Sequence, residues 1–140
     1  MKKLVTILFI CLAVLTSGYT GYKHKKFKCG IIFNEQPFTK ETANDYSKKF
    51  SRGQRIYWLF MSKKAIKAQF IKVQVVSATH KTGFATISGI VYTHDYRINK
   101  DSPHYFTDYL VIHSPGHYYM QIFDHNQLYK PLTIADFYVR

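Results

Sequence analysis

The chain has little cysteine and little acidic charge. Cys11 and Cys29 are the two cysteines among 140 residues, so no disulfide framework carries the fold. The sequence contains no C-x-x-C pair, no Gly-rich phosphate loop and no G-x-S-x-G nucleophile motif. Its 8 acidic residues form no close pair and no metal-ligand run. These absences weigh against a glycosidase, a calcium site or a thiolate zinc site. We therefore expect no enzymatic activity and no cofactor.

The residues that are abundant are basic and aromatic. Lys and Arg number 20, which gives a formal net charge of +12, and 17% of the residues are Phe, Trp or Tyr. With 46% hydrophobic residues the chain is not a disordered tail. A chain of this length builds one domain with a genuine core.

The amino terminus resembles an export signal. Lys2 and Lys3 precede an uncharged, mostly apolar run over 4–17, which is shorter than the ~20 residues of a typical membrane span. Small residues then lead up to a cleavage point after Gly18. We predict a signal peptide at 1–18, a flexible basic arm at 19–30, one domain at 31–140, and a periplasmic or secreted location.

An uncleaved anchor is the alternative for the same segment. No charge occurs from Leu4 to Tyr22, which is long enough for a minimal span. The basic flank up to Lys28 then contacts the membrane surface, so that residues 4–28 hold the protein at the membrane.

The body of the chain alternates in hydropathy with a period of two, which is typical of strands. Ile71, Val73 and Val75, for example, alternate with polar residues. Strands are predicted at 31–34, 54–61, 69–77, 84–92, 105–113, 117–124 and 132–140, with one helical turn near 40–46. We expect a core that contains Trp58, Phe60, Phe106, Tyr118 and Phe137. Short strands without helical periodicity predict an all-β sandwich.

The segment Gly116-His117-Tyr118-Tyr119-Met120 resembles the tyrosine corner of immunoglobulin-like domains. In that motif a Tyr near the start of a strand bonds back to the preceding corner. The pattern over 31–140 is similar to bacterial immunoglobulin-like or fibronectin III-like modules, although the Cys…Trp…Cys framework of antibody domains is missing. The resemblance implies an antiparallel sandwich of about seven strands, with structural roles for Tyr118, Trp58 and Gly116.

In the topology that the resemblance implies, three loops share one pole: 61–68, 93–104 and 124–130. These loops carry the basic residues that we predict to bind a partner: Lys63, Lys64, Lys67, Arg97, Lys100 and Lys130. The partner is a protein or an anionic envelope component, such as a polymer or a lipid headgroup. Nucleic acid is not expected, since no recognised binding motif occurs. The sequence leaves the oligomeric state open.

The same loops support a second hypothesis. His94, His104 and His125 are imidazole ligands of the kind that Zn²⁺ and Cu²⁺ accept. If the three rings converge, the protein is a small extracytoplasmic metal-binding protein.

Overall fold

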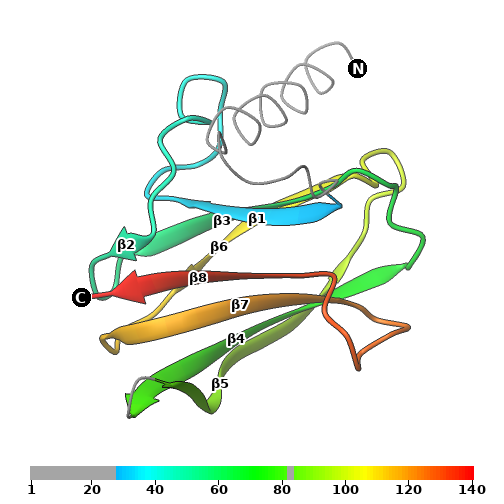
Figure 1. The fold of residues 1–140 in the computed structure, drawn as a ribbon. Coiled ribbons are helices and arrows are strands. Elements are labelled where there is room, and N and C mark those ends of the chain that lie inside the picture. Colours follow the sequence, from blue (N-terminus) through cyan, green and yellow to red (C-terminus); the bar gives the residue numbers. More distant parts are fainter. Residues whose placement is uncertain (1–27, 82–83) are drawn as a thin grey trace, which may run out of the picture.

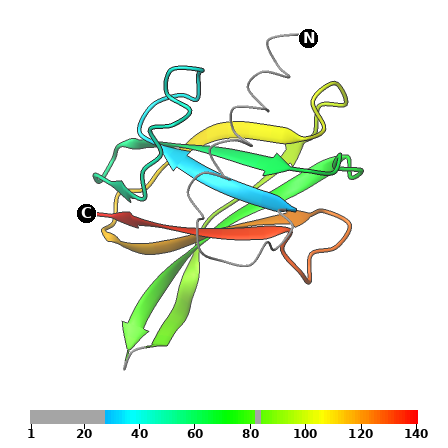
Figure 2. The same ribbon diagram turned by 45° about the horizontal axis from the view of Figure 1, so that its top comes forward.

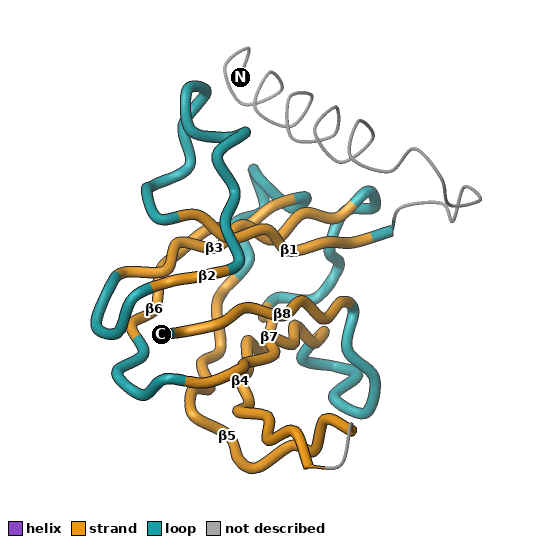
Figure 3. The backbone as a smooth tube through the Cα atoms, turned by 60° about the vertical axis from the view of Figure 1, so that its left-hand side comes forward, coloured by secondary structure: helices purple, strands orange, loops and turns teal. Residues whose placement is uncertain are grey.

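A computed structural model describes residues 28–81 and 84–140 (Figure 1). This part of the chain consists of strands and loops, with no helix (Figure 3). The strands are β1 (Cys29–Asn34), β2 (Lys49–Phe50), β3 (Arg55–Ser62), β4 (Phe70–Lys81), β5 (Phe84–Arg97), β6 (Tyr105–Val111), β7 (Gly116–Asp124) and β8 (Thr133–Val139). The predicted signal at 1–18 lies outside the described residues. Among those described, no helix is long and apolar enough to cross a membrane.

The strands form two sheets that face one another (Figures 1 and 2). One sheet has the order β1-β3-β6, and the other has the order β2-β8-β7-β4-β5. All neighbours pair antiparallel except β2 and β8, which pair in parallel. The predicted all-β sandwich is therefore confirmed.

The core lies between the sheets and follows the sequence alternation. Ile71, Val73 and Val75 of β4 are fully buried, whereas Lys72 and Gln74 between them are only half-buried. Successive residues of a strand point to opposite faces of the sheet, so the apolar set of β4 reaches the core as a group. Burial of one such side chain contributes about 1.5–3 kcal/mol.

Large aromatic side chains fill the centre of the core. Trp58, Phe60 and Phe137 are fully buried, and Tyr118 is 3% exposed. Phe106 packs against the cluster from a partly buried position at the side of the core. The predicted core is thus confirmed, with Phe106 at its margin.

A second, smaller cluster lies on the outer face of the three-stranded sheet. Leu59 and Met61 of β3 are buried there, with Ile32, Phe38 and Tyr105 packed against them. Phe38 belongs to the β1–β2 connection, which therefore covers part of this face. Because both faces of β3 are covered, its sequence is a continuous apolar run rather than an alternating one.

The boundaries of several elements differ from the prediction. β5 continues to Arg97, so residues 93–97 belong to a strand and not to a loop, because β4 supplies pairing partners as far as Phe70. β2 was not predicted, since two residues are too short to show a period. Residues 40–44 form turns without a helix. β1 begins at Cys29, inside the predicted arm.

The predicted turn between β6 and β7 has the contact expected of a tyrosine corner. The Tyr118 hydroxyl donates a 2.8 Å hydrogen bond to the Ser114 carbonyl, and the Tyr118 ring stacks on Phe137 with centroids 5.6 Å apart. A Cβ at Gly116 would lie 3.4 Å from that ring, which is an ordinary van der Waals contact. Burial raises the pKa of the Tyr118 phenol.

Candidate functional site

Three connections gather at the end of the sandwich opposite the carboxyl terminus (Figures 1 and 2). They are residues 63–69 between β3 and β4, 98–104 between β5 and β6, and 125–132 between β7 and β8. We call these three segments the loop pole. The grouping that the predicted topology implied is therefore present, with shifted loop boundaries: the second loop begins at 98 instead of 93, and the third extends to 132 instead of 130.

Backbone hydrogen bonds join the first two of these loops. Ser62 N–H donates to the His104 carbonyl at 2.7 Å, and Ile66 N–H donates to the Pro103 carbonyl at 2.8 Å. Ile98 N–H in turn donates to the Gln69 carbonyl at 2.9 Å. Backbone groups that bond to each other leave the loops little freedom, so the two loops form one frame.

The third loop is attached through its first residues. His125 N–H donates to the Phe70 carbonyl at 3.2 Å. The Asp124 carboxylate accepts the Asn126 N–H at 2.8 Å, which is the geometry of an Asx turn. Residues 126–130 are exposed, Tyr129 to 84%, and at the end of the loop Leu132 N–H donates to the Ile122 carbonyl at 2.7 Å.

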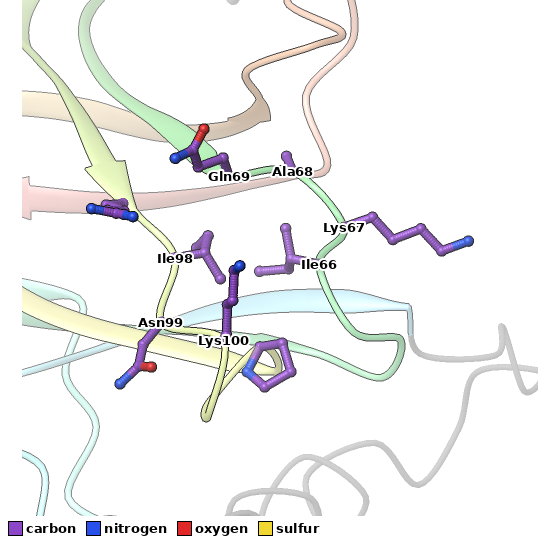
Figure 4. A pocket seen from close by; sticks show the side chains of 9 residues that line it. Ile66, Lys67, Ala68, Gln69, Ile98, Asn99 and Lys100 are labelled. Atoms are coloured by element: carbon purple, nitrogen blue, oxygen red, sulfur yellow. The ribbon is translucent and has the colours of Figure 1, made fainter.

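A pocket of about 850 Å³ lies between the first two loops (Figure 4). Lys67, Arg97 and Lys100 are the charged residues of its lining, which contains no carboxylate. All three are exposed. The lining therefore carries positive charge without an acidic residue, and a positively charged cavity attracts anions.

The other lining residues are apolar or carry amides. Ile66 and Ile98 point toward each other across the pocket (Figure 4), and Ala68 and Pro103 add to its apolar lining. Ile98 is 7% exposed and Ala68 is 5% exposed, so part of this surface is continuous with the protein interior.

The predicted binding residues separate into two groups. The structure brings Lys67, Arg97 and Lys100 to the pocket. Lys63 and Lys64 lie on the same β3–β4 loop, exposed and outside the lining. Lys130 is exposed on the β7–β8 loop and does not line the pocket either.

Two carboxylates lie near the loop pole without lining the pocket. One oxygen of Asp95 lies 3.6 Å from Lys72 Nζ, and the other lies 3.4 Å from His125 Nε2, so Asp95 pairs with groups outside the pocket. Asp101 follows Lys100 in the 98–104 loop and is exposed, and its backbone N–H donates to the Asn99 side chain at 3.0 Å.

The three candidate histidine ligands have separate surroundings. His94 belongs to β5, not to a loop, and its ring centroid lies 4.5 Å from that of Tyr96. The Nδ1 of His104 lies 3.2 Å from the Ser62 carbonyl oxygen, while His125 faces Asp95. Within residues 28–81 and 84–140, no group of three or more His, Cys, Asp or Glu side chains is placed to hold a metal ion.

A polar cluster that the sequence analysis missed lies on the outer face of the five-stranded sheet. Asp136 accepts a 2.7 Å bond from Lys48 Nζ and lies 3.1 Å from His117 Nε2. The His117 ring stacks on Tyr138, with centroids 4.2 Å apart and planes at 5°. Burial raises the pKa of Asp136, but the hydrogen bonds from Lys48 and His117 outweigh burial, so the pKa lies below its ordinary value.

The apolar residues of the pocket were also missed. Ile66 and Ile98 are isolated hydrophobic residues within basic loop sequences, and that isolation was the available signal. Ile66 and Ile98 lie close together because β4 pairs with β5, and the sequence of either loop alone does not reveal this pairing.

Comparison with solved structures supports the fold. The soluble domain of PmoD from Methylocystis sp. (Rockwell) is similar with a TM-score of 0.51 and 12% identity, over 84% of this chain and 95% of that chain. At this identity the likeness concerns the fold alone. A β-glucosidase from Listeria innocua aligns with a TM-score of 0.40 and 10% identity, over 85% of this chain and 17% of that chain, which supports no inference. No protein-family model matches the sequence, and no curated protein matches it.

Proposed function

We propose that this protein is an exported immunoglobulin-like module that binds an anionic ligand at its loop pole and performs no chemistry of its own. The observation that carries the proposal is the pocket lined by Lys67, Arg97 and Lys100 without a carboxylate. The surface of a basic protein has many lysines. A cavity whose lining includes three cations and no acid is more specific.

The immunoglobulin-like assignment is supported by strand order and by the corner contact. In the constant-type sandwich the first, second, fifth and fourth strands form one sheet, and the third, sixth and seventh strands form the other. With the short β2 set aside, β1, β3 and β6 take the places of the first, second and fifth strands, and β4, β7 and β8 take those of the third, sixth and seventh. The fourth strand, β5, pairs with β4 instead, and β2 adds a parallel edge next to β8. The Tyr118–Ser114 bond occupies the place of the tyrosine corner.

The charge of the whole chain favours the same class of partner. The full chain has a net charge of +12, and a chain that starts at Tyr19 has lost Lys2 and Lys3, so that its 18 basic and 8 acidic residues give +10. Such a charge attracts polyanions over long range, and salt screens this attraction over about 8–10 Å. We propose that the attracted anion then binds in the pocket. Phosphate- or carboxylate-bearing polymers of the cell envelope carry the charge that such a pocket requires.

Binding to polyphosphate tests the proposal. The triple variant Lys67→Gln, Arg97→Gln, Lys100→Gln is expected to weaken binding by about tenfold or more, or about 1.4 kcal/mol. Binding of the wild-type chain is expected to weaken as salt rises from about 50 to 200 mM.

The matched control removes three exposed cations from outside the pocket lining: Lys40→Gln, Lys49→Gln and Arg52→Gln. Both variants lose the same net charge, so this control is expected to bind nearly as well as the wild type. Equal losses in the two variants would show that net charge alone attracts polyphosphate, and would contradict a site at the loop pole.

The proposed export has its own test. Amino-terminal sequencing with intact mass, on protein recovered from cell fractions, is expected to give a start at Tyr19 outside the cytoplasm. An intact Met1 in the membrane fraction would replace export with the anchored alternative.

A further inference from the structure

The pocket at the loop pole combines two kinds of surface that a simple anion site does not need. Lys100 extends toward the space between Ile66 and Ile98, whereas the Lys67 side chain extends away from them (Figure 4). A hydrated phosphate gains from the cation and nothing from the two isoleucines. The apolar walls are therefore unexplained by charge alone.

The apolar part of the pocket is preformed. The Ile66 N–H bond to Pro103 and the Ile98 N–H bond to Gln69 join the two loops at the isoleucines themselves. Ile98 also belongs to the main hydrophobic core, and Ile66 packs against that core. Binding sites for small molecules are usually preformed in this way, so a ligand does not have to order these loops.

The cationic part is held close to the apolar part. Lys100 follows Asn99 in a turn closed by the Ser102 N–H bond to the Asn99 carbonyl at 3.0 Å. Arg97 is the last residue of β5, directly before Ile98. Each of these cations thus adjoins the apolar walls in both sequence and space.

We propose that the pocket binds an amphiphilic anion, a single molecule that carries a phosphate or carboxylate head on a short apolar chain. The inference rests on the proposed function and specifies its ligand. Arg97 and Lys100 pair with the head, and the chain lies between Ile66 and Ile98. The volume of about 850 Å³ falls within the range of about 300–1,000 Å³ that is typical of small-molecule sites.

The experiment is a chain-length series measured by titration calorimetry on the full chain. The probes are inorganic phosphate and butyl, hexyl and octyl phosphate, each below its critical micelle concentration, with hexanol as the neutral comparison. Each buried methylene is expected to tighten Kd by about fourfold, and hexanol is expected to bind far more weakly than hexyl phosphate.

Two variants separate the head from the chain. Arg97→Gln with Lys100→Gln is expected to weaken every phosphate probe. Ile66→Gln is expected to flatten the chain-length dependence, while the control Ile134→Gln, on the outer face of β8 and 50% exposed, is expected to keep the chain-length dependence of the wild type. The wild-type series needs no variant, so the proposal stays testable if Ile66→Gln fails to fold.

Other outcomes would overturn the inference in distinguishable ways. If the Arg97–Lys100 variant loses phosphate binding but Kd does not change with alkyl chain length, the proposed anion site would be retained and the amphiphilic ligand would be rejected. Equal binding of hexanol and hexyl phosphate would remove the role of the cations. Binding to vesicles with phosphatidylglycerol, without binding of the monomeric probes, would assign the pole to a membrane surface. No binding of polyphosphate or of any probe would overturn both proposals.

Discussion

The hydroxyl of Tyr118 donates a hydrogen bond of 2.8 Å to the carbonyl oxygen of Ser114, four residues earlier in the chain. The bond fixes the turn between β6 and β7 to the strand that leaves it. Since β6 and β7 belong to different sheets, the contact holds a crossing of the sandwich in place.

The variant Tyr118→Phe removes this bond and keeps the ring on Phe137. We expect the free energy of unfolding to fall by about 0.5–1.5 kcal/mol, because Ser114 is exposed and water can replace the lost donor. Urea denaturation measures the change. Tyr129→Phe, at an 84% exposed position, is the control, and an equal loss there would contradict a role for the corner bond.

The cluster around Asp136 predicts a pH dependence at acid pH. Hydrogen bonds from Lys48 and His117 lower the pKa of Asp136 from 3.8 despite its partial burial. A carboxyl with a lowered pKa in the folded state stabilises the fold above its unfolded pKa, and this contribution disappears as pH falls through the folded value. Asp136→Asn is expected to lower stability at pH 6 and to reduce the further loss below pH 3.8. Asp101→Asn, at an exposed turn, is the control and should keep the wild-type dependence of the free energy of unfolding on pH, measured by urea denaturation. If Asp136→Asn also keeps the wild-type dependence, the cluster around Asp136 contributes nothing to stability.

The surroundings of Tyr96 predict that the free energy of unfolding also depends on pH in the alkaline range. Burial, together with hydrogen bonds to Tyr92 and Asp108, raises the pKa of this phenol well above 10.0. The Tyr92 and Tyr96 hydroxyls are 2.6 Å apart. A group with a raised pKa contributes stability below its unfolded pKa and loses it as pH rises toward its folded pKa. The loss of unfolding free energy above pH 10 is therefore expected to be smaller in Tyr96→Phe than in the wild type. If the free energy of unfolding falls equally steeply above pH 10 in both proteins, Tyr96 does not have the raised pKa.

The same substitution is expected to lower the free energy of unfolding by different amounts on the two faces of the five-stranded sheet. Ile122 on β7 is fully buried, whereas Ile134 on β8 is 50% exposed. Ile122→Ala is expected to cost about 2–5 kcal/mol because it leaves a cavity. Ile134→Ala is expected to stay within about 0.5 kcal/mol of the wild type. Similar costs at both positions, measured by denaturation, would mean that the outer face is covered in solution.

Much of the fold follows from local patterns. The alternation of Ile71, Val73 and Val75 with polar residues has a period of two, and a strand with one face buried produces that period directly. The turn before Tyr118 is equally local, because Pro115 and Gly116 set its geometry within three residues. β2 has no such signal: two residues contain no period, and its place beside β8 depends on a strand that is far away in sequence.

For the candidate site, too, some features follow from the sequence and others only from the tertiary structure. The sequence by itself determined that the three loops predicted at one pole carry six of the 20 basic residues, because charge and turn composition can be counted along a chain. It also determined that C-x-x-C, Gly-rich phosphate and G-x-S-x-G motifs are missing. Only the tertiary structure decided that Lys67 and Lys100 line one pocket while Lys63 and Lys130 do not, and that Ile66 faces Ile98. The reason is physical: residues more than thirty positions apart meet through the register of β3, β4, β5 and β6, and that register is set by the burial of the whole core rather than by any segment alone.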